Sequence, residues 1–144
     1  MRLSLHSDYA LRLLMHAGVS SGKLISAEDA AQAFGLSKNH LMKVIYRLGQ
    51  CGFIETVRGR NGGFKLAFPP GEINIGAVVR EMEFDLAIVE CLGTSNTCVI
   101  SPACRLTGIM REALDAWLAV LDRYTLADLL NRPNQLERLL ALPQ

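Results

Sequence analysis

Residues 37 to 68 read SKNHLMKVIYRLGQCGFIETVRGRNGGFKLAF, and this stretch decides the fold. Its first part is a helix pattern, because apolar residues recur at helical spacing behind a polar first turn. Its second part contains two strand-like runs, residues 54–57 and 64–68, on either side of a tip rich in arginine and glycine. The stretch therefore predicts a helix followed directly by a β-hairpin. The apolar stripe of the helix consists of Leu41, Val44, Ile45 and Leu48.

A second helix is predicted just before this stretch. Ser26 and Asp29 have the spacing of a capping box, and the alanine-rich run behind them extends to about Phe34. Gly35 ends this helix, and Ser37 is placed to cap the next one. Two helices joined by a tight glycine turn are typical of a helix-turn-helix, whose second helix presents its N-terminus to the major groove of DNA. A solvated helix start is the alternative interpretation.

The hairpin that follows predicts a wing. Asn61, Gly62 and Gly63 are expected to supply the positive φ that a hairpin turn needs. Arg58 and Arg60 then lie at the tip, where they can enter a minor groove or bind phosphate. A glycine-rich phosphate loop is disfavoured, because GxxxxGK[ST] is absent and the segment leads into a strand. The predicted fold class is mostly α with a small β-hairpin wing, a winged helix-turn-helix.

The charge of the chain is concentrated around these two motifs. Residues 37 to 65 hold six basic residues and one acidic residue, a net charge of +5, whereas the rest of the chain carries −4. Such segregation favours a surface that meets a polyanion. Lys, Arg, Asn and His side chains donate to phosphates and base edges, so the polar residues of the second helix and the wing are the candidate DNA contacts. These candidates are Ser37, Lys38, Asn39, His40, Lys43, Arg58, Arg60, Asn61, Gly62 and Gly63.

Three further helices are expected around these motifs. The N-terminal one runs from Ser7, its N-cap, to about Val19, with Asp8 in the first turn, where a carboxylate complements the helix dipole. Another starts after Asn74. The longest is expected to have Ser101 as N-cap with a proline at N1, and to extend for about twenty residues, or roughly 30 Å.

The long helix carries a broad apolar stripe. So small a domain has little core left for it, so the sequence predicts that a second subunit packs on this helix. After it, Thr125 and Asp128 resemble another capping box, ahead of a short amphipathic tail. The stripe consists of Leu106, Ile109, Met110, Ala113, Leu114, Trp117, Val120, Leu121 and Tyr124.

Three of the four cysteines, Cys91, Cys98 and Cys104, lie in a segment of turn-forming residues. An odd number of thiols is awkward for internal disulfides and suits a metal or iron–sulfur site that takes its last ligand from elsewhere. There is no CxxC pair, which disfavours a zinc ribbon or a thioredoxin-type couple. Three unrelated buried thiols remain the alternative. Cys51 is interpreted as a packing residue.

The composition indicates one or two small units with a core. The chain has 144 residues, is 50% apolar and has a mean hydropathy of +0.22. It contains no run of about 18 apolar residues and no pattern of a signal peptide. We therefore expect a cytoplasmic protein with no membrane segment, where thiols stay reduced and available as ligands.

Five blocks of sequence, in order, resemble the IscR/NsrR family of bacterial winged-helix iron–sulfur regulators, and most closely its nitric-oxide-sensitive repressors of the NsrR type. The resemblance implies a homodimer in which the long helices pair and each cysteine loop carries a cluster, most often [4Fe-4S]. It implies that Cys91, Cys98 and Cys104 bind the cluster and that Asp8 of the other subunit is the fourth ligand. The interval between Cys91 and Cys98 is longer than is usual in the family. The blocks are residues 8–12 (DYALR), 37–43 (SKNHLMK), 57–63 (VRGRNGG), 102–106 (PACRL) and 121–129 (LDRYTLADL).

The resemblance also implies a function. A repressor of this type binds a palindromic double-stranded operator as a homodimer and releases it when nitric oxide attacks the cluster. Residues 1–72 would form the DNA-binding domain, and residues 73–144 the cluster loop and dimerisation helices. IscR-type members use a histidine three residues after the last cysteine, where this chain has Thr107. A regulator of iron or cluster status, or one with a zinc or thiol switch, is the alternative.

No enzyme is expected. His6, His16 and His40 all lie outside the cysteine loop, so the thiols there have no histidine base nearby in sequence. A small electron carrier is a further alternative, but it would not need the basic segment or the wing. The sequence therefore favours a DNA-binding regulator over both classes.

Overall fold

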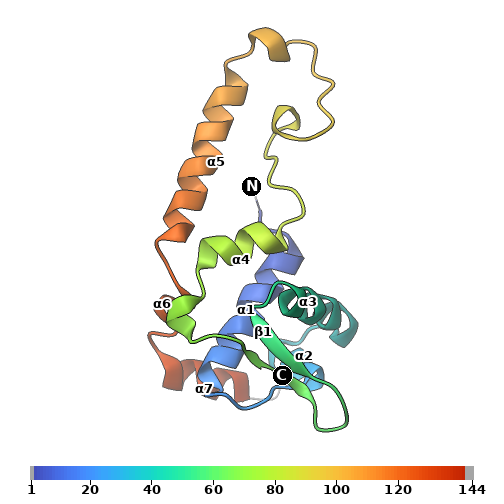
Figure 1. Ribbon diagram of the computed structural model, residues 1–144, viewed down its shortest axis with the longest axis vertical. Coiled ribbons are helices and arrows are strands. Elements are labelled where there is room, and N and C mark those ends of the chain that lie inside the picture. Colours follow the sequence, from blue (N-terminus) through green and yellow to red (C-terminus); the bar gives the residue numbers. More distant parts are fainter. Residues whose placement is uncertain (1, 142–144) are drawn as a thin grey trace.

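The computed structural model describes residues 2–141 and is mostly helical with one small hairpin. The hairpin lies at one end, and the long helix α5 extends toward the opposite end (Figure 1). The predicted fold class is therefore confirmed. The helices are α1 (Leu5–Val19), α2 (Ala27–Phe34), α3 (Lys38–Gln50), α4 (Ile75–Met82), α5 (Leu106–Asp122), α6 (Leu126–Leu129) and α7 (Pro133–Ala141); the strands are β1 (Ile54–Val57) and β2 (Gly63–Leu66); and the short 3₁₀ turns are η1 (Pro70–Glu72), η2 (Glu90–Leu92) and η3 (Ser101–Ala103).

Helix α1 begins two residues before Ser7, so the prediction of Ser7 as its N-cap is wrong. The N-cap is Ser4, whose hydroxyl accepts a hydrogen bond from the Ser7 N–H at 3.2 Å. The Ser4 N–H in turn donates to the Glu83 carboxylate at 2.7 Å, which anchors the start of α1 beside the end of α4. Ser7 itself is fully buried. Asp8 lies in the first turn, as predicted.

The helix-turn-helix forms as the caps predict. The Ser26 hydroxyl accepts from the Asp29 N–H at 3.0 Å, and α2 ends at Phe34. Gly35 follows with φ of +63°, a left-handed conformation in which a side chain would be strained. Ser37 occupies the N-cap position of α3 in an extended conformation, although its side chain makes no capping hydrogen bond.

The hairpin differs from its prediction at the tip. Strands β1 and β2 pair antiparallel, but β2 ends at Leu66, and Phe68, expected to continue it, is exposed. The positive φ is at Gly59, with +110°, and not at residues 61–63. The tip closes there because the Gly62 N–H donates to the Gly59 carbonyl at 3.0 Å.

Two glycines of the wing are needed for close backbone approach. A Cβ on Gly62 would collide with the Val57 carbonyl, and a Cβ on Gly63 would collide with the Ile25 carbonyl. Ile25 forms an isolated bridge with Phe64, through two hydrogen bonds of 2.9 Å. Because Phe64 is only 1% exposed, this bridge attaches the wing to the core just before α2.

A single hydrophobic core joins both halves of the chain. Residues of α1, α3 and the hairpin pack with residues of α4 and with Leu126 of α6. Helix α7 returns to pack against α1 and α2, which confirms the amphipathic tail. The Asp128 carboxylate accepts from the Thr125 N–H at 2.7 Å, as the second capping box predicts. Across residues 2–141, none of the helices is long and apolar enough to cross a membrane.

The start of α4 and the end of α5 are joined by polar contacts. The Asn74 side chain caps α4 by accepting from the Ala77 N–H at 2.9 Å, and it donates to the Asp122 carbonyl at 2.7 Å. The Arg80 guanidinium forms a two-pronged ion pair with the Asp122 carboxylate and holds the pKa of that carboxyl below its usual value. The base of α5 is therefore held against the helix that packs on the core.

Changing Asn74 to alanine is expected to lower the free energy of unfolding by about 1–2 kcal/mol, because one residue supplies both the cap of α4 and a bond to α5. Chemical denaturation at fixed protein concentration measures this loss. Asn74→Ser keeps a capping acceptor but is too short to bond to the Asp122 carbonyl, so its loss is expected to be smaller. Equal stability of Asn74→Ala and the wild type would contradict the role.

Helix α5 starts later than predicted. Ser101 and Pro102 form the separate turn η3, and Cys104 then has extended backbone angles, so the helix begins only at Leu106. Its 17 residues give a length of about 25 Å at 1.5 Å per residue. The prediction that Ser101 caps this helix is therefore wrong.

The apolar stripe of α5 is divided into two edges. Successive residues of an α-helix are about 100° apart, so Leu118, which the predicted stripe did not include, lies on the opposite side of the helix from Ile109. The partly buried residues of the stripe, Met110, Leu114, Trp117 and Leu121, lie toward Leu118. Leu118 is buried at 7% exposure, whereas Ile109 is 54% exposed. Leu106 and Val120 are exposed beside Ile109, at 49% and 44%. One edge packs within the chain, and the other edge is apolar and exposed.

Candidate nucleic-acid interface and cysteine loop

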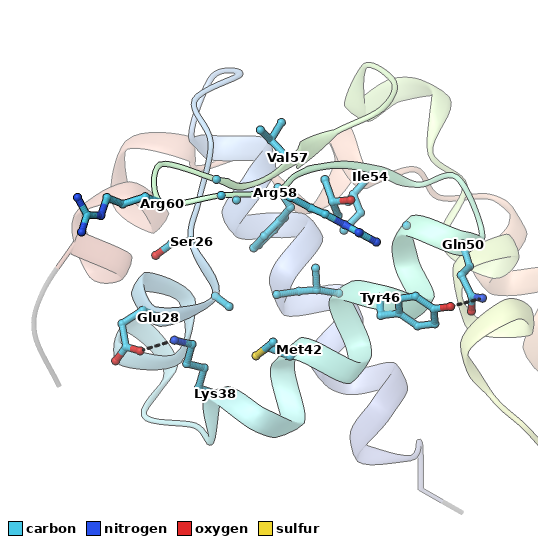
Figure 2. A pocket seen from close by; sticks show the side chains of 18 residues that line it. Ser26, Glu28, Lys38, Met42, Tyr46, Gln50, Ile54, Val57, Arg58 and Arg60 are labelled. Carbon is cyan, nitrogen blue, oxygen red and sulfur yellow. Dashed lines mark hydrogen bonds and ion pairs between the residues drawn. The ribbon is translucent and has the colours of Figure 1, made fainter.

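A groove of about 870 Å³ separates α3 from the hairpin (Figure 2). It is lined by the start of α2, by one side of α3 and by the tip of the wing. Helix α3 and the hairpin are adjacent in the sequence, and in the structure they lie on either side of one groove. Of the candidate DNA contacts, Lys38, Arg58, Arg60, Gly62 and Gly63 line it.

The other candidates are exposed but lie outside the groove lining. Ser37, Asn39, His40 and Lys43 are exposed at the start of α3, and Asn61 is exposed on the wing. They remain predictions.

The exposed face of α3 also includes three residues that the sequence reading missed. Met42 and Tyr46 are 51% and 66% exposed, and Gln50 donates to the Tyr46 hydroxyl at 3.1 Å. At about 100° per residue, Met42, Tyr46 and Gln50 lie on the same side of the helix as Asn39, opposite the buried stripe. The exposure of these three residues could have been predicted from the sequence, because their positions fall between the core positions of α3 at helical spacing. A search for basic residues does not find them, because none of the three carries a charge.

The three basic residues of the groove differ in whether their side chains are already paired. The Lys38 ammonium is 3.2 Å from the Glu28 carboxylate, across the turn between α2 and α3. Both side chains are at least half exposed, so this pair adds little to stability and can open. The side chains of Arg58 and Arg60 diverge from the wing, with Arg60 directed outward (Figure 2). Both residues are exposed, as a phosphate contact requires.

The cysteine loop lies beside α5, at the end of the molecule away from the wing (Figure 1). Its thiols are free; Cys91 and Cys104 are partly buried, and Cys98 is exposed. Residues 94–100 are all exposed, so the loop is held mainly by local hydrogen bonds. Within residues 2–141, no three His, Cys, Asp or Glu side chains lie close enough to hold a metal ion. The structure therefore does not bring Cys91, Cys98, Cys104 and Asp8 together within one chain.

Asp8 lies on α1 and forms an ion pair with Arg12. The Arg12 guanidinium donates to both carboxylate oxygens, at 2.7 and 3.3 Å. The Asp8 side chain keeps 39% of its surface exposed, so a second molecule can reach it. Within its own chain, Asp8 complements the dipole at the start of α1 and forms this ion pair with Arg12.

Cys51 lies away from the loop, at the end of α3. Its thiol is 3.6 Å from the Glu81 carboxylate, which Arg47 also approaches. Burial raises the pKa of the Cys51 thiol; the nearby Arg47 charge opposes this rise, and the Glu81 carboxylate adds to it. Since metals bind the thiolate form, this environment disfavours Cys51 as a ligand.

His6 lies at the junction of α1, α3 and α4. Its ring is 5.2 Å from the Phe84 ring, centroid to centroid. Burial lowers the pKa of His6 and the nearby Arg47 charge lowers it further, while Glu83 opposes both. The imidazole therefore favours the neutral form, consistent with a packing role.

The cysteine loop fits an iron–sulfur cluster in the chemistry of its donors. Three free thiols are the ligands that iron–sulfur clusters use, and each has some access to solvent. A loop with no buried residue between Cys91 and Cys104 can rearrange around a bound group at small cost. The thiols are therefore the right type of ligand for a cluster, although they are not gathered around one point in this structure.

The sequence matches one family model and many curated proteins. The family is Rrf2, described as "Iron-dependent Transcriptional regulator", and its model matches residues 3–132. The chain is 49% identical to the HTH-type transcriptional regulator NsrR of Bacillus subtilis over 146 residues, covering 100% of both chains. It is 50% identical to NsrR of Geobacillus kaustophilus over 142 residues, covering 97% of each.

Solved structures share the fold. The oxidised form of CymR from Staphylococcus aureus superposes with a TM-score of 0.72 at 27% identity, covering 91% of this chain and 97% of that one. IscR of T. potens superposes with a TM-score of 0.69 at 25% identity, covering 90% and 86%. CymR of B. subtilis, the global cysteine regulator, gives 0.67 at 25% identity, covering 90% and 95%. The similarity thus extends over nearly the whole length of each structure.

Proposed function

The chain belongs to the Rrf2 family of iron-dependent transcriptional regulators, and from this premise we propose that it is a cytoplasmic repressor that senses nitric oxide through an iron–sulfur cluster. Members of the family are transcriptional regulators, so the protein is a regulator and not an enzyme. The observation that carries the proposal is the full-length identity of about half to regulators named NsrR. Three free cysteines on one exposed loop support it independently.

The groove between α3 and the wing is the proposed DNA-binding surface. Asn39, Lys43, Tyr46 and Gln50 face outward on α3, where a helix in the major groove presents donors and apolar groups to base edges. The wing would bind the adjacent backbone or minor groove. Ser37, Lys38 and His40 of α3 and Arg58, Arg60, Asn61, Gly62 and Gly63 of the wing complete the proposed contacts.

Changing Arg60 to alanine is expected to weaken DNA binding and to flatten its salt dependence by about one unit per subunit, because each lost phosphate contact releases one counterion fewer. Fluorescence anisotropy measures this at several salt concentrations, with a duplex selected by the protein from random sequence and with an unrelated duplex. Arg111→Ala is the control, since Arg111 is exposed on α5, away from the wing. An unaltered slope would remove Arg60 from the phosphate contacts.

The exposed edge of α5 is the proposed dimer interface. Leu106, Ile109 and Val120 are about half exposed along one side of the helix, and apolar residues in such a row favour burial against a partner. A two-fold dimer would match a palindromic operator, with one α3 helix for each half-site. Residues 73–144 would thus serve pairing and sensing, and residues 1–72 DNA binding, although both halves share one core.

Cys91, Cys98 and Cys104 are the residues that would hold the cluster, which we propose to be of the [4Fe-4S] type. When bound, the cluster would supply iron that nitric oxide can attack. Asp8 of the second subunit is the proposed fourth ligand. Its ion pair with Arg12 is partly exposed, so the carboxylate can be shared with, or released to, a partner.

The coupling to DNA follows from where Asp8 lies. It is on α1, which packs against α3, so a bond from Asp8 to the partner's loop would set the position of the DNA-reading helix. Loss of that bond would let the two reading helices move relative to each other. A dimer recognises two half-sites only when the spacing of its two reading helices matches the spacing of the half-sites. A small movement of the helices can therefore cost most of the specific affinity.

An anaerobic absorption and EPR spectrum before and after stoichiometric nitric oxide tests the proposal, with DNA binding measured on the same samples. We expect visible absorption that nitric oxide bleaches, together with loss of binding to the selected duplex. Absorption and binding that resist nitric oxide but respond to iron chelation would instead make the protein an iron-status regulator. A protein that stays colourless after reconstitution with iron and sulfide would contradict the cluster.

A further inference from the structure

We propose that Glu90 is a clasp that closes the cysteine loop, so that Cys91 and Cys98 are already neighbours when iron arrives. This inference rests on the proposed function, since it gives Glu90 a positioning role toward the cluster those thiols would hold. It concerns the protein before the cluster binds, and it can therefore be tested without one.

The clasp consists of two short hydrogen bonds to a single carboxylate oxygen. Glu90 is the first residue of the turn η2, and its Oε1 accepts from the Thr97 N–H and from the Thr97 hydroxyl, each at 2.7 Å. Its backbone carbonyl accepts from the Gly93 N–H at 3.0 Å. Hydrogen bonds to a carboxylate are charge-assisted and stronger than neutral ones. One residue therefore joins both ends of the segment.

The clasp acts directly on the positions of two thiols. Glu90 precedes Cys91, and Thr97 precedes Cys98, so the two cysteines are the next residues beyond the bonded pair. Without closure, seven residue steps could separate Cys91 from Cys98 by up to ~24 Å. Because the Glu90 side chain holds residue 97, the chain between the two cysteines is folded back and cannot reach that span.

Asn96 extends this closure toward the third cysteine. Its Oδ1 accepts from the Cys98 N–H at 3.0 Å, and its Nδ2 donates to the Ser101 hydroxyl at 2.8 Å. The Ser101 carbonyl accepts from the Cys104 N–H at 3.3 Å. Successive local bonds thus lead from Glu90 along the loop to Cys104.

Apolar packing does not hold this segment closed. Residues 94–100 are exposed, and Val99 and Ile100 are 91% and 61% exposed, so no apolar contact within the described chain closes it. Closing a flexible loop costs conformational entropy, and the cost falls on cluster assembly unless the loop is closed beforehand. The long interval between the first two cysteines increases the need for such a closure.

A direct role of Glu90 as an iron ligand is the competing interpretation, and two substitutions separate it from the clasp. Glu90→Gln keeps a carbonyl oxygen that can accept both bonds from Thr97, but an amide is a poor ligand for iron compared with a carboxylate. Glu90→Ala removes both functions. Glu112→Ala removes an exposed carboxylate of α5 and is the control for charge.

The first measurement is amide hydrogen exchange in the full chain, prepared without iron. In Glu90→Ala the Thr97 N–H is expected to exchange about tenfold faster than in the wild type, because it loses a charge-assisted bond. The second measurement is the rate at which visible absorption grows during anaerobic reconstitution with ferrous iron and sulfide. Glu90→Ala is expected to assemble about fivefold more slowly, since its loop must close as iron binds.

Faster exchange and slower assembly in Glu90→Ala, with Glu112→Ala near wild type and Glu90→Gln between the wild type and Glu90→Ala, would support the clasp, because the amide accepts both bonds without the charge. Unchanged exchange at Thr97, or unchanged assembly despite faster exchange, would overturn it. Equal defects in Glu90→Gln and Glu90→Ala would also overturn it, in favour of a need for the carboxylate itself. A wild type that takes up no iron would contradict the proposed function, while the exchange result would still decide whether the clasp exists.

Discussion

Replacing Cys98 by alanine is expected to abolish the proposed iron–sulfur binding while leaving the fold and the proposed dimer intact. Cys98 is an exposed residue of a loop outside the core, so its loss leaves no cavity. A site with only two remaining thiolates loses most of its affinity for a cluster. Iron and acid-labile sulfide are expected to fall to background, and affinity for the selected duplex about 10- to 100-fold, toward nonspecific binding.

Cys51→Ala is the matched control for this prediction. The Cys51 thiol faces Glu81, and burial raises its pKa, so it is not expected to bind iron. The control should retain iron, sulfide and DNA affinity. Undiminished operator binding by Cys98→Ala, at wild-type iron content, would show that this loop is not the sensor. Circular dichroism and sedimentation of both variants check that fold and dimer persist.

Changing Ile109 to aspartate is expected to convert the proposed dimer to monomers. Ile109 is 54% exposed on the apolar edge of α5, so pairing of two such helices would bury two new carboxylates without partners. Since a buried unpaired charge is costly, the dimer dissociation constant is expected to rise at least about 100-fold. Sedimentation velocity over a range of concentrations measures this. Affinity for a palindromic duplex should fall in parallel, because one subunit reads one half-site.

The control is Arg111→Asp, which places the same side chain about 160° around the helix, away from that edge. Arg111 is exposed, so neither substitution disturbs the core of the chain. Wild-type dimerisation of Ile109→Asp would contradict the proposed interface. Dissociation of both variants would show that added charge on α5, and not the apolar edge, is responsible.

Several elements could be predicted from the sequence because neighbouring residues determine them. The Ser26 cap, the left-handed Gly35 and the Asn74 cap all form as expected, since each needs only groups within three or four residues. The hairpin was predictable for the same reason, with its strands joined by a short glycine-rich tip. Family membership followed from residue blocks along the whole chain, and the comparisons confirm it.

The DNA-binding surface was partly predictable. Basic residues at the start of α3 and on the wing marked it, and Lys38, Arg58 and Arg60 do line one groove. Tyr46 and Met42 were missed because an apolar side chain in a helix is usually interpreted as core. Only the packed structure shows that they lie opposite the buried side of α3.

The sequence by itself determined the winged helix-turn-helix, the positions of the free cysteines and the family. The tertiary structure decided where α1 starts, because Glu83, far along the chain, binds the backbone at Ser4. It also decided that Gly63 is required by the approach of Ile25, and that only one edge of the α5 stripe is used within the chain. The physical reason is the range of the contacts. Caps and turns close within a few residues, whereas burial and backbone approach depend on segments that meet only after the chain has folded.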